Sequence, residues 1–332
     1  MRHLILPMLG GLKSLMPGVN FRGVGGASAR YVYAVWARHL ATMAEHGVDV
    51  PRGTVVELGP GDTLGLCLAA LLTGSATAVA LDVVRHVSAA QTRQIFADLV
   101  ALYRARAPLP ADDELPRVYP RMTGPRELSR VVDEATLAAA LTPERVARIA
   151  ERLEAAVQDS VQHDTHDDGA RGDGDQTGAV CLRYTCPWTA SSVRAGTADV
   201  VVSQSALEYL PHESGSGGLS AAFASMRRWL RVGGVISHQI NLASPFGREW
   251  NAHWAVGDAA WRIVRGRRPH YENRVPLSEY VRLCADHGFK VLVARVTHAP
   301  EGVARGRLAP RFRDLAAEDY TATNVHLLAR KR

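Results

Sequence analysis

The segment from Thr54 to Asp82 constrains the fold of this 332-residue chain more than any other. A short apolar run, TVVEL at 54–58, leads directly into Gly59-Pro60-Gly61, an apolar helical pattern that ends at Gly74, and a second apolar run at 77–82. A strand, a glycine-rich turn, a helix and a strand within about 30 residues predict a βαβ unit. Such a unit implies a parallel sheet with a right-handed crossover.

Two carboxylates lie at the ends of the strands in this unit. The glycines allow the backbone to approach a ligand, and the following helix N-terminus offers free N–H groups. Glu57 would repel the pyrophosphate of a dinucleotide and attract an ammonium group, such as the one in the methionine part of S-adenosylmethionine. Asp82 could accept hydrogen bonds from ribose hydroxyls, which both cofactors contain, so Asp82 does not decide between them.

The remaining apolar runs extend the same pattern. Further strands are predicted at 179–184, 199–204, 233–240, 290–297 and 322–331, with helices at 219–230 and 278–289. The fold class is therefore α/β, with a Rossmann-like, doubly wound sheet of about seven strands, mostly parallel with the last strand antiparallel. We expect this domain to span residues 51–332.

Three other segments surround the sheet. Residues 1–50 form an expected N-terminal helical arm, with an amphipathic helix over 28–47 capped by Ser28. Residues 100–157 form a helical insertion, with helices near 126–141 and 143–157, that we expect to cover one edge of the sheet. Residues 158–178 contain six aspartates, one arginine and no aromatic residue, a composition that predicts a mobile loop.

Charge and cysteine content narrow the class of protein. The net charge is +6, and 36 of the 39 basic residues are arginine, which raises the question of nucleic-acid binding. The four cysteines form no CxxC pair, a pattern that argues against a zinc ribbon, a redox motif and a disulfide framework. No apolar run approaches the roughly 20 residues of a membrane span. We therefore expect a cytoplasmic protein without a membrane partner.

The motifs together resemble the class I S-adenosylmethionine-dependent methyltransferases. VVELGPGDTLG at 55–65 and the strand ending at Asp82 carry the resemblance, together with ADVVVSQSALEYL at 198–210 and RWLRVGGVISHQINL at 228–242. It covers roughly residues 52–90 and 179–330. The combination of LGPGD, SQSALEYL, SHQINL, EWN and YENR is similar to a bacterial subgroup associated with sugar and natural-product pathways. The resemblance implies a methyltransferase that uses S-adenosyl-L-methionine and methylates an O or N atom of a small polar acceptor.

The resemblance also assigns roles to residues. It implies that the cofactor is bound by residues after the first four strands, namely Glu57, Gly59, Pro60, Gly61, Asp82, Val83, Pro187, Trp188, Ser203 and Gln204. Thr63 replaces the third glycine of the family's usual E-x-G-x-G-x-G, which changes the detail of the turn. The acidic residue that family members often place near the adenine is absent.

Methyl transfer requires an aligned acceptor that loses its proton before or during attack. His238 is the candidate base, because it lies near the end of the fifth strand and histidine is readily poised near pH 7. Glu208 is the second candidate. Substrate contacts are expected from residues in the surrounding loops and the first helix, namely Tyr31, Asn241, Trp250, Asn251 and Arg274. We predict no metal requirement, since the His- and Asp-rich tract at 163–168 lacks a rigid second layer of ligand-orienting groups.

Other functions stay open at this point. Gly59, Gly61 and Gly65 make a partial fingerprint of an NAD-dependent oxidoreductase, against which Glu57 argues. A basic RNA- or partner-binding protein on a methyltransferase-like fold is a third possibility, although no arginine–aromatic RNA-binding module is present. Five arginines within 262–274 favour either an anionic small acceptor or simply a solvated basic face.

Overall fold

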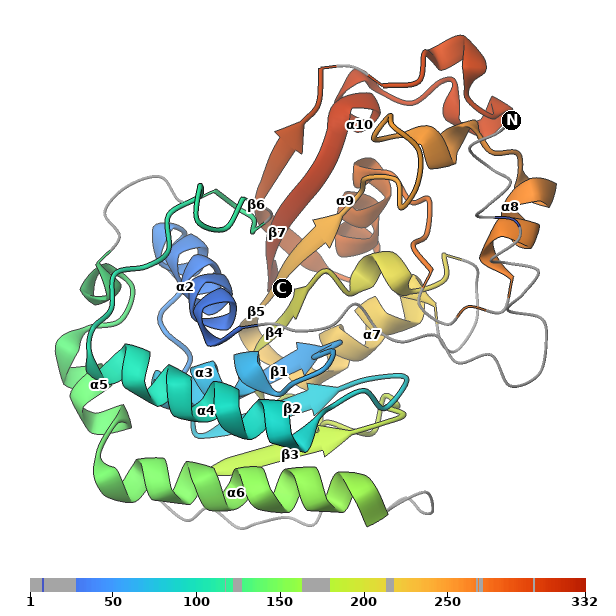
Figure 1. The fold of residues 1–332 in the computed structure, drawn as a ribbon. Helices are drawn as coiled ribbons and strands as arrows, with labels where there is room; N and C mark the ends of the chain where they lie inside the picture. The colour runs from blue at the N-terminus through green and yellow to red at the C-terminus, as the bar shows by residue number, and fades with distance from the viewer. Residues whose placement is uncertain are drawn as a thin grey trace.

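A seven-stranded mixed sheet forms the centre of the molecule in the computed structural model (Figure 1). The structure describes residue 8 and residues 28–116, 118–121, 127–162, 180–212, 218–266, 268, 271–300 and 302–332. The strands are β1 (Thr54–Leu58), β2 (Thr77–Leu81), β3 (Cys181–Thr185), β4 (Ala198–Gln204), β5 (Leu230–Asn241), β6 (Phe289–His298) and β7 (Ala322–Lys331). The sequence prediction of seven strands is confirmed, each within a few residues of its expected position.

The strand order is β3-β2-β1-β4-β5-β7-β6. Strands β1 to β5 are parallel, and β7 pairs antiparallel with both β5 and β6. The predicted mostly parallel sheet with an antiparallel last strand is therefore confirmed. The chain passes outward from β1 through β2 to β3, and then returns to place β4 on the other side of β1. The carboxyl ends of β1 and β4 thus lie at the topological switch point, where ligands bind in open α/β sheets.

Helices cover both faces of the sheet. Helices α2 (Ala29–Glu45), α3 (Gly65–Leu72) and α4 (Ala89–Arg104) share one apolar core, with Val55 and Val202 on the adjoining face of the sheet. Helices α7 (Leu219–Trp229) and α9 (Leu277–Asp286) pack with the opposite face, where Val56 and Ile236 point. This alternation follows from the period of two along each strand.

Helix α2 confirms the helix predicted at 28–47, and the Ser28 hydroxyl accepts a hydrogen bond from the Tyr31 backbone N–H at 3.1 Å. Most of its residues are buried in the core that α3 and α4 also share, so α2 is built into the layer over the sheet. Residues 1–7 and 9–27 of the expected arm lie outside the described residues.

The insertion contains η1 (Leu128–Arg130), α5 (Glu134–Ala140) and α6 (Pro143–Gln162). Helix α6 runs beside the edge strand β3, as Figure 1 shows, so the helical cover expected for one sheet edge is present. The loop predicted to begin at 158 is wrong over 158–162, because α6 continues to Gln162. Residues 163–179 lie outside the described part of the chain.

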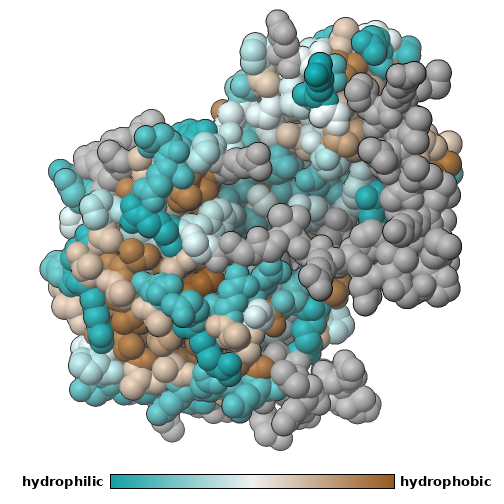
Figure 2. Space-filling model, in the orientation of Figure 1, coloured by the Kyte–Doolittle hydropathy of each residue, from teal (hydrophilic) through white to brown (hydrophobic). Residues whose placement is uncertain are grey.

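The carboxyl-terminal third carries shorter elements beyond the sheet, namely η2 (Leu207–Tyr209), η3 (Ala252–Ala255), α8 (Asp258–Arg265), η4 (Arg305–Arg307), η5 (Pro310–Phe312) and α10 (Ala317–Thr321). Within the described residues, no helix has the length and apolar character needed to cross a bilayer. On the face shown in Figure 2, hydrophilic and hydrophobic residues are interspersed over α4 and α6.

Candidate functional site at the carboxyl ends of β1, β4 and β5

The turns after β1 and β4 meet at the switch point. Gly59 has φ +69° and Gly61 has φ +67°, a backbone region that disfavours other residues. A Cβ placed on Gly59 would lie 2.7 Å from the Cβ of Ala206, whereas a Cβ on Gly61 would have nothing within 4 Å. Gly59 is therefore needed for the contact between the two turns, and Gly61 leaves open space beside the backbone.

Glu57 is buried at the end of β1, with 4% of its surface exposed. Burial raises the pKa of its carboxyl to about 7, although hydrogen bonds from the thiol and backbone N–H of Cys67 act in the opposite direction. Its Oε2 atom has no hydrogen-bond partner. A buried carboxyl oxygen without a partner is costly, so this atom is suited to a ligand that supplies a donor or a positive charge.

Asp82 is held at the end of β2 by its own turn. Its Oδ1 accepts hydrogen bonds from the backbone N–H groups of Val83 at 2.7 Å and Val84 at 3.4 Å. The backbone N–H of Trp188 donates to the Asp82 carbonyl at 3.1 Å, which brings the segment after β3 alongside. Val83 and Pro187 are exposed and Trp188 is half-buried, its ring 5.5 Å from that of Trp229. These four predicted cofactor-binding residues are therefore neighbours along one sheet edge.

Tyr31 lies over the same edge from helix α2. Its hydroxyl is hydrogen-bonded to Gln204 at the end of β4. Burial raises the pKa of the phenol, and the nearby charges of Glu208 and Glu57 raise it further, against the effect of the Gln204 hydrogen bond. Tyr31 therefore contacts the end of β4 and lies within electrostatic range of both Glu57 and Glu208.

Glu208, in the short helix η2, is 2% exposed. Its Oε1 accepts a hydrogen bond from the Asn241 backbone N–H at 3.2 Å, and its Oε2 has no partner. The Asn241 side-chain amide donates to Glu272 Oε1 at 3.4 Å, so one asparagine links two carboxyls. Burial raises the pKa of Glu208 to about 8, helped by the charge of Glu272, and burial raises the pKa of Glu272 to about 7.

His238 does not lie at this edge, and the structure does not support its assignment as the base. Its side chain is fully buried between β5 and α7, with Nδ1 2.8 Å from the Ser203 hydroxyl and Nε2 3.1 Å from the Met226 sulfur. Burial lowers the pKa of the imidazole to about 3. Ser203 points into the same interior layer and is also fully buried, so its side chain does not border the site.

Two of the residues predicted to contact substrate, Asn251 and Trp250, make contacts within the protein. Asn251 is fully buried, and its side-chain amide bonds the backbone N–H and carbonyl of Val303 at 2.6 and 3.3 Å. Trp250 packs edge-on against Trp254, with ring centroids 5.3 Å apart. These contacts hold the segment after β5 to the segment that precedes α10.

The Arg274 guanidinium is 4.6 Å from the Trp261 ring and 5.2 Å from that of Phe312, and it donates to Asp258 and to the Val256 carbonyl. It is 6% exposed, so the charge is already enclosed and paired. The role of Arg274 in substrate binding stays a prediction, and in this structure its guanidinium is bound by groups of the protein itself.

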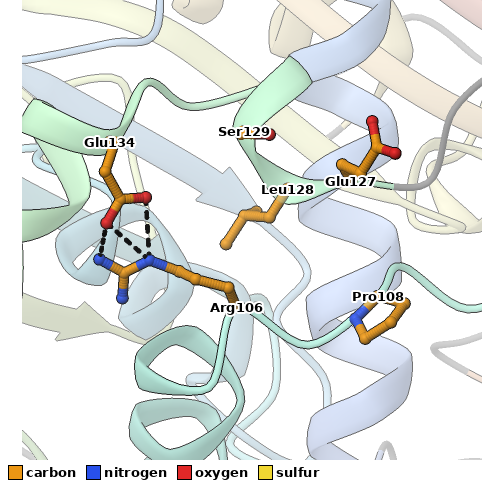
Figure 3. A pocket seen from close by; sticks show the side chains of 6 residues that line it. All are labelled: Arg106, Pro108, Glu127, Leu128, Ser129 and Glu134. Atoms are coloured by element: carbon orange, nitrogen blue, oxygen red, sulfur yellow. Dashed lines mark hydrogen bonds and ion pairs between the residues drawn. The ribbon is translucent and has the colours of Figure 1, made fainter.

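A separate hollow lies beside η1 and the start of α5. It has a volume of about 560 Å³ and is lined by Arg106, Pro108, Glu127, Leu128, Ser129 and Glu134 (Figure 3). Arg106 Nε donates to Glu134 at 3.0 Å, so the principal cation of this hollow is already paired. The described residues contain no group of three or more side chains arranged to hold a metal ion.

Sequence reasoning missed two residues of the carboxyl edge. Glu272 lies in the YENR segment, and Cys67 lies in the apolar helical pattern that follows Gly61. Both become relevant through contacts with Glu208 and Glu57 respectively, which a one-dimensional pattern does not reveal. The one sequence signal for Glu272 is that it is acidic and lies in the YENR segment, where Arg274 is predicted to contact the acceptor.

No protein-family model matches the chain, and no curated protein matches it. Among solved structures, it is similar to an S-adenosylmethionine-dependent methyltransferase from Mesorhizobium loti, with 13% identity, TM-score 0.39, and coverage of 93% of this chain and 100% of that one. A geranyl diphosphate methyltransferase in complex with SAM gives 13% identity, TM-score 0.39, and coverage of 89% and 85%. A SAM-dependent methyltransferase from Methanosarcina mazei gives 10% identity, TM-score 0.38, and coverage of 84% and 92%. We base the proposed function on the residues of the site and not on these similarities.

Proposed function

We propose that the protein binds S-adenosyl-L-methionine at the β1–β4 switch point and transfers the methyl group to a small polar acceptor. The observation that carries the proposal is the buried Glu57 carboxyl, with an oxygen lacking a partner, at the turn that contains Gly59 and Gly61. An ammonium group would supply both the charge and the donors that this oxygen lacks.

The surrounding residues fit the remaining parts of the cofactor. Open space beside Gly61 gives a ligand access to the backbone. Asp82 and the exposed Val83 are at the end of β2, where a ribose and an adenine would extend toward Pro187 and Trp188. Tyr31 and Gln204 would border the methionine part, since they are hydrogen-bonded to one another beside Glu57.

An NAD-dependent oxidoreductase is less well supported. The dinucleotide-binding fold has the parallel order 3-2-1-4-5-6, whereas here the antiparallel β7 lies between β5 and β6. Glu57 would also place a carboxyl at the turn that receives the pyrophosphate in that fold. Both features favour a cationic cofactor over a dinucleotide.

When bound, S-adenosyl-L-methionine supplies an electrophilic methyl group on a sulfonium. The protein must align the acceptor in line with it and accept or hold the acceptor's proton. Glu208 suits that task, because its pKa of about 8 leaves both protonation states populated near neutral pH. Asn241 fixes the Glu208 carboxyl through its backbone N–H at 3.2 Å. We therefore propose Glu208, and not His238, as the base.

We further propose that the acceptor is a small metabolite, such as a sugar or natural-product intermediate, methylated on O or N in the cytoplasm. The resemblance in the sequence motifs supports this part of the proposal.

The test is a calorimetric titration with S-adenosyl-L-methionine, S-adenosylhomocysteine, NAD⁺ and NADH. We expect the first two to bind, and we expect Glu57→Gln to weaken both about tenfold to a hundredfold, the usual effect of losing a charge-assisted hydrogen bond. Gln retains the shape and hydrogen-bonding capacity toward Cys67 but carries no charge.

The control is Glu154→Gln. Glu154 is a residue of α6 whose exposed carboxylate pairs with Arg93 of α4 at 2.7 Å. This variant should bind both methionine nucleosides as the wild type does. Binding of NAD⁺ or NADH without binding of S-adenosyl-L-methionine would refute the proposal.

A further inference from the structure

Two carboxyls, those of the buried Glu208 and the half-buried Glu272, lie side by side at the end of β5, and neither pairs with a cation among the described residues. Glu208 and Glu272 both bond Asn241, one through its backbone N–H and the other through its side-chain amide. Each retains an Oε2 atom without a hydrogen-bond partner. Within the residues that the structure describes, no arginine, lysine or histidine forms an ion pair with either of them.

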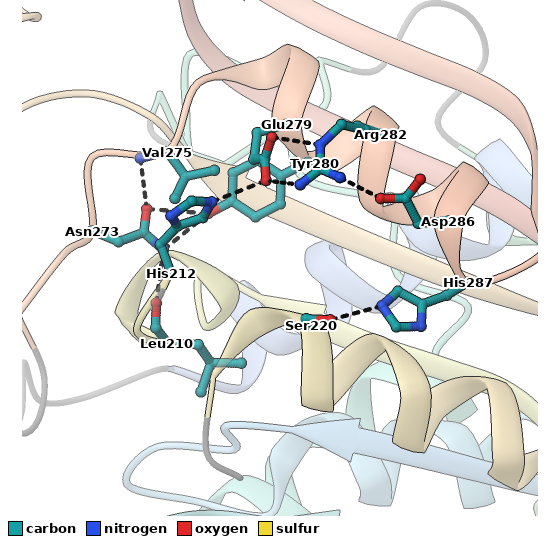
Figure 4. Close-up of polar contacts among 10 residues, drawn as sticks. All are labelled: Leu210, His212, Ser220, Asn273, Val275, Glu279, Tyr280, Arg282, Asp286 and His287. Atoms are coloured by element: carbon teal, nitrogen blue, oxygen red, sulfur yellow. Dashed lines mark hydrogen bonds and ion pairs between the residues drawn. The ribbon is translucent and has the colours of Figure 1, made fainter. Parts of the chain in front are cut away.

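The backbone that presents this pair is fixed by Asn273. Its backbone N–H donates to the Glu208 carbonyl at 2.5 Å. Its side-chain amide donates to the carbonyls of Leu207 at 3.2 Å and Leu210 at 3.0 Å, and Figure 4 shows it between Leu210 and Tyr280. The segment carrying Glu272 is thereby fastened to η2, which carries Glu208, so their proximity is part of the fold.

The pair adjoins the proposed methionine site. The charge of Glu208 reaches the phenol of Tyr31, which is hydrogen-bonded to Gln204 and is also influenced by Glu57. The turn after β1 also contacts the turn after β4, where Gly59 meets Ala206, two residues before Glu208. A ligand bound at Glu208 would therefore lie next to a cofactor bound at Glu57.

A buried carboxyl pair without a cation is unfavourable, because each charge is desolvated and each repels the other. A protonated amine removes both costs, since it brings a positive charge and up to three donors to oxygens that have no partner. A hydroxyl brings one donor and no charge, and a carboxylate or phosphate adds repulsion. Two of the arginines expected to bind an anion lie against aromatic rings: Arg274 is enclosed by Trp261 and Phe312, and Arg268 lies 3.9 Å from the Tyr271 ring.

We propose that Glu208 and Glu272 bind a protonated amino group of the methyl acceptor, so that the protein acts on an amine. This inference rests on the proposed function. Glu208, as the carboxylate, accepts one proton from the ammonium group and becomes a neutral acid, which leaves the amine nitrogen with a free lone pair. Glu272 remains beside it as the second contact to the now neutral amino group.

The inference is tested by binding. Wild-type protein saturated with S-adenosylhomocysteine is screened by thermal shift against small primary and secondary amines, matched in size with alcohols and carboxylic acids. We expect the stabilising compounds to be amines, and titration of the best amine to give binding about tenfold to a hundredfold weaker in Glu208→Gln and Glu272→Gln. The Gln side chains preserve the oxygen that accepts from Asn241.

Glu279→Gln is the matched control. Glu279 lies near the pair on α9 but is bonded by Arg282 and by His212 at 2.9 Å, as Figure 4 shows. Its substitution should leave amine binding unchanged. Preferential binding of alcohols or acids, amine binding that survives both substitutions, or a wild type that binds no amine in the library each overturns the inference.

Titration with S-adenosyl-L-methionine separates this failure from that of the proposed function. If the nucleoside binds and amines do not, only the amine site is refuted. If the nucleoside does not bind, the methyltransferase proposal is refuted whatever the amines do.

Discussion

Burial decides which single residues of this protein titrate near neutral pH. It lowers the pKa of His238 and of His253 to about 3, and it raises the pKa of Glu57 to about 7 and of Glu208 to about 8. Desolvation disfavours the charged form of either group. The pKa of a buried imidazole therefore falls well below 7, whereas the pKa of a buried carboxyl rises toward 7. An exposed histidine would have a pKa suited to a base at neutral pH, but in this interior the carboxyls have pKa values closer to 7 than the imidazoles do.

His238 provides a test at this scale. Its folded pKa of about 3 lies below the ordinary value of 6.5, so the unfolded chain takes up a proton first as the pH falls. The stability that the neutral imidazole contributes is present above pH 6.5 and declines at about 1.4 kcal/mol per pH unit, reaching about 2 kcal/mol lost at pH 5. In His238→Gln, we expect the decrease in unfolding free energy between pH 7.5 and 5 to be smaller by about that amount.

Urea unfolding at the two pH values measures the difference between His238→Gln and the wild type. The same variant should retain binding of S-adenosylhomocysteine. A fold with unchanged pH dependence would show that the imidazole is not neutral in the interior, and loss of turnover with binding intact would restore it as the base.

Individual elements follow closely from local sequence. All seven strands were predictable, because each contains an apolar run bounded by turn residues. The Ser28 cap and the start of α6 at Pro143 were predictable for a similar reason, since capping depends on adjacent residues. The end of α6 was not, because a polar composition does not exclude a further helical turn continuing from an apolar face.

The candidate site was only partly predictable. Residues attached to strand ends, such as Glu57 and Asp82, were found because parallel strands present their carboxyl ends at one edge. The contacts that Trp250, Asn251 and Arg274 make within the protein could not be predicted, because a polar loop side chain can face either a ligand or a neighbouring loop. Here Asn251 bonds Val303 and Arg274 bonds Asp258, contacts between segments far apart in sequence.

The paired turns after β1 and β4 give a prediction at the scale of elements. Gly59→Ala and Gly61→Ala both introduce a side chain at positive φ, with a cost of about 1–2 kcal/mol. Only the Cβ at 59 also meets Ala206, at 2.7 Å, and must push the two turns apart. We expect Gly59→Ala to have the lower unfolding free energy of the two.

Gly61→Ala should instead act mainly on ligand binding, because its methyl group would occupy the open space beside the turn. Chemical unfolding and titration with S-adenosylhomocysteine, made on both variants, give the comparison. Equal stability of the two would contradict the contact between the turns, and unimpaired binding by Gly61→Ala would remove that space from the site.

Across the whole molecule, the carboxyls and the imidazoles with shifted pKa values have opposite effects on how stability depends on pH. Burial raises the carboxyl pKa values at the sheet edge and lowers the imidazole pKa values in the interior; the groups are Glu57, Glu208, Glu272, His39, His238, His253 and His326. A carboxyl with a raised pKa contributes stability that is full below its unfolded pKa and is lost as the pH rises through its folded value. A histidine with a lowered pKa contributes stability that is full above pH 6.5 and is lost on acidification. The three carboxyls therefore lower the pH at which the protein is most stable, and the four histidines raise it.

The unfolding free energy is greatest where the folded and unfolded states bind equal numbers of protons. For these groups that point lies at about pH 6, where the protons on the histidines of the unfolded chain equal those on the carboxyls of the folded protein. Above it, the wild type should lose on the order of 1–2 kcal/mol by pH 8, as Glu57, Glu272 and then Glu208 ionise in the folded protein.

The triple variant Glu57→Gln/Glu208→Gln/Glu272→Gln keeps only the histidine contribution, so its stability should rise, not fall, from pH 6.5 to 8. Glu279→Gln should follow the wild type, because hydrogen bonds from Arg282 already hold that carboxyl's pKa at about 2. Urea unfolding across pH 5–8 measures all three proteins, and a wild type whose stability climbs steadily to pH 8 would mean that the edge carboxyls are already ionised and paired.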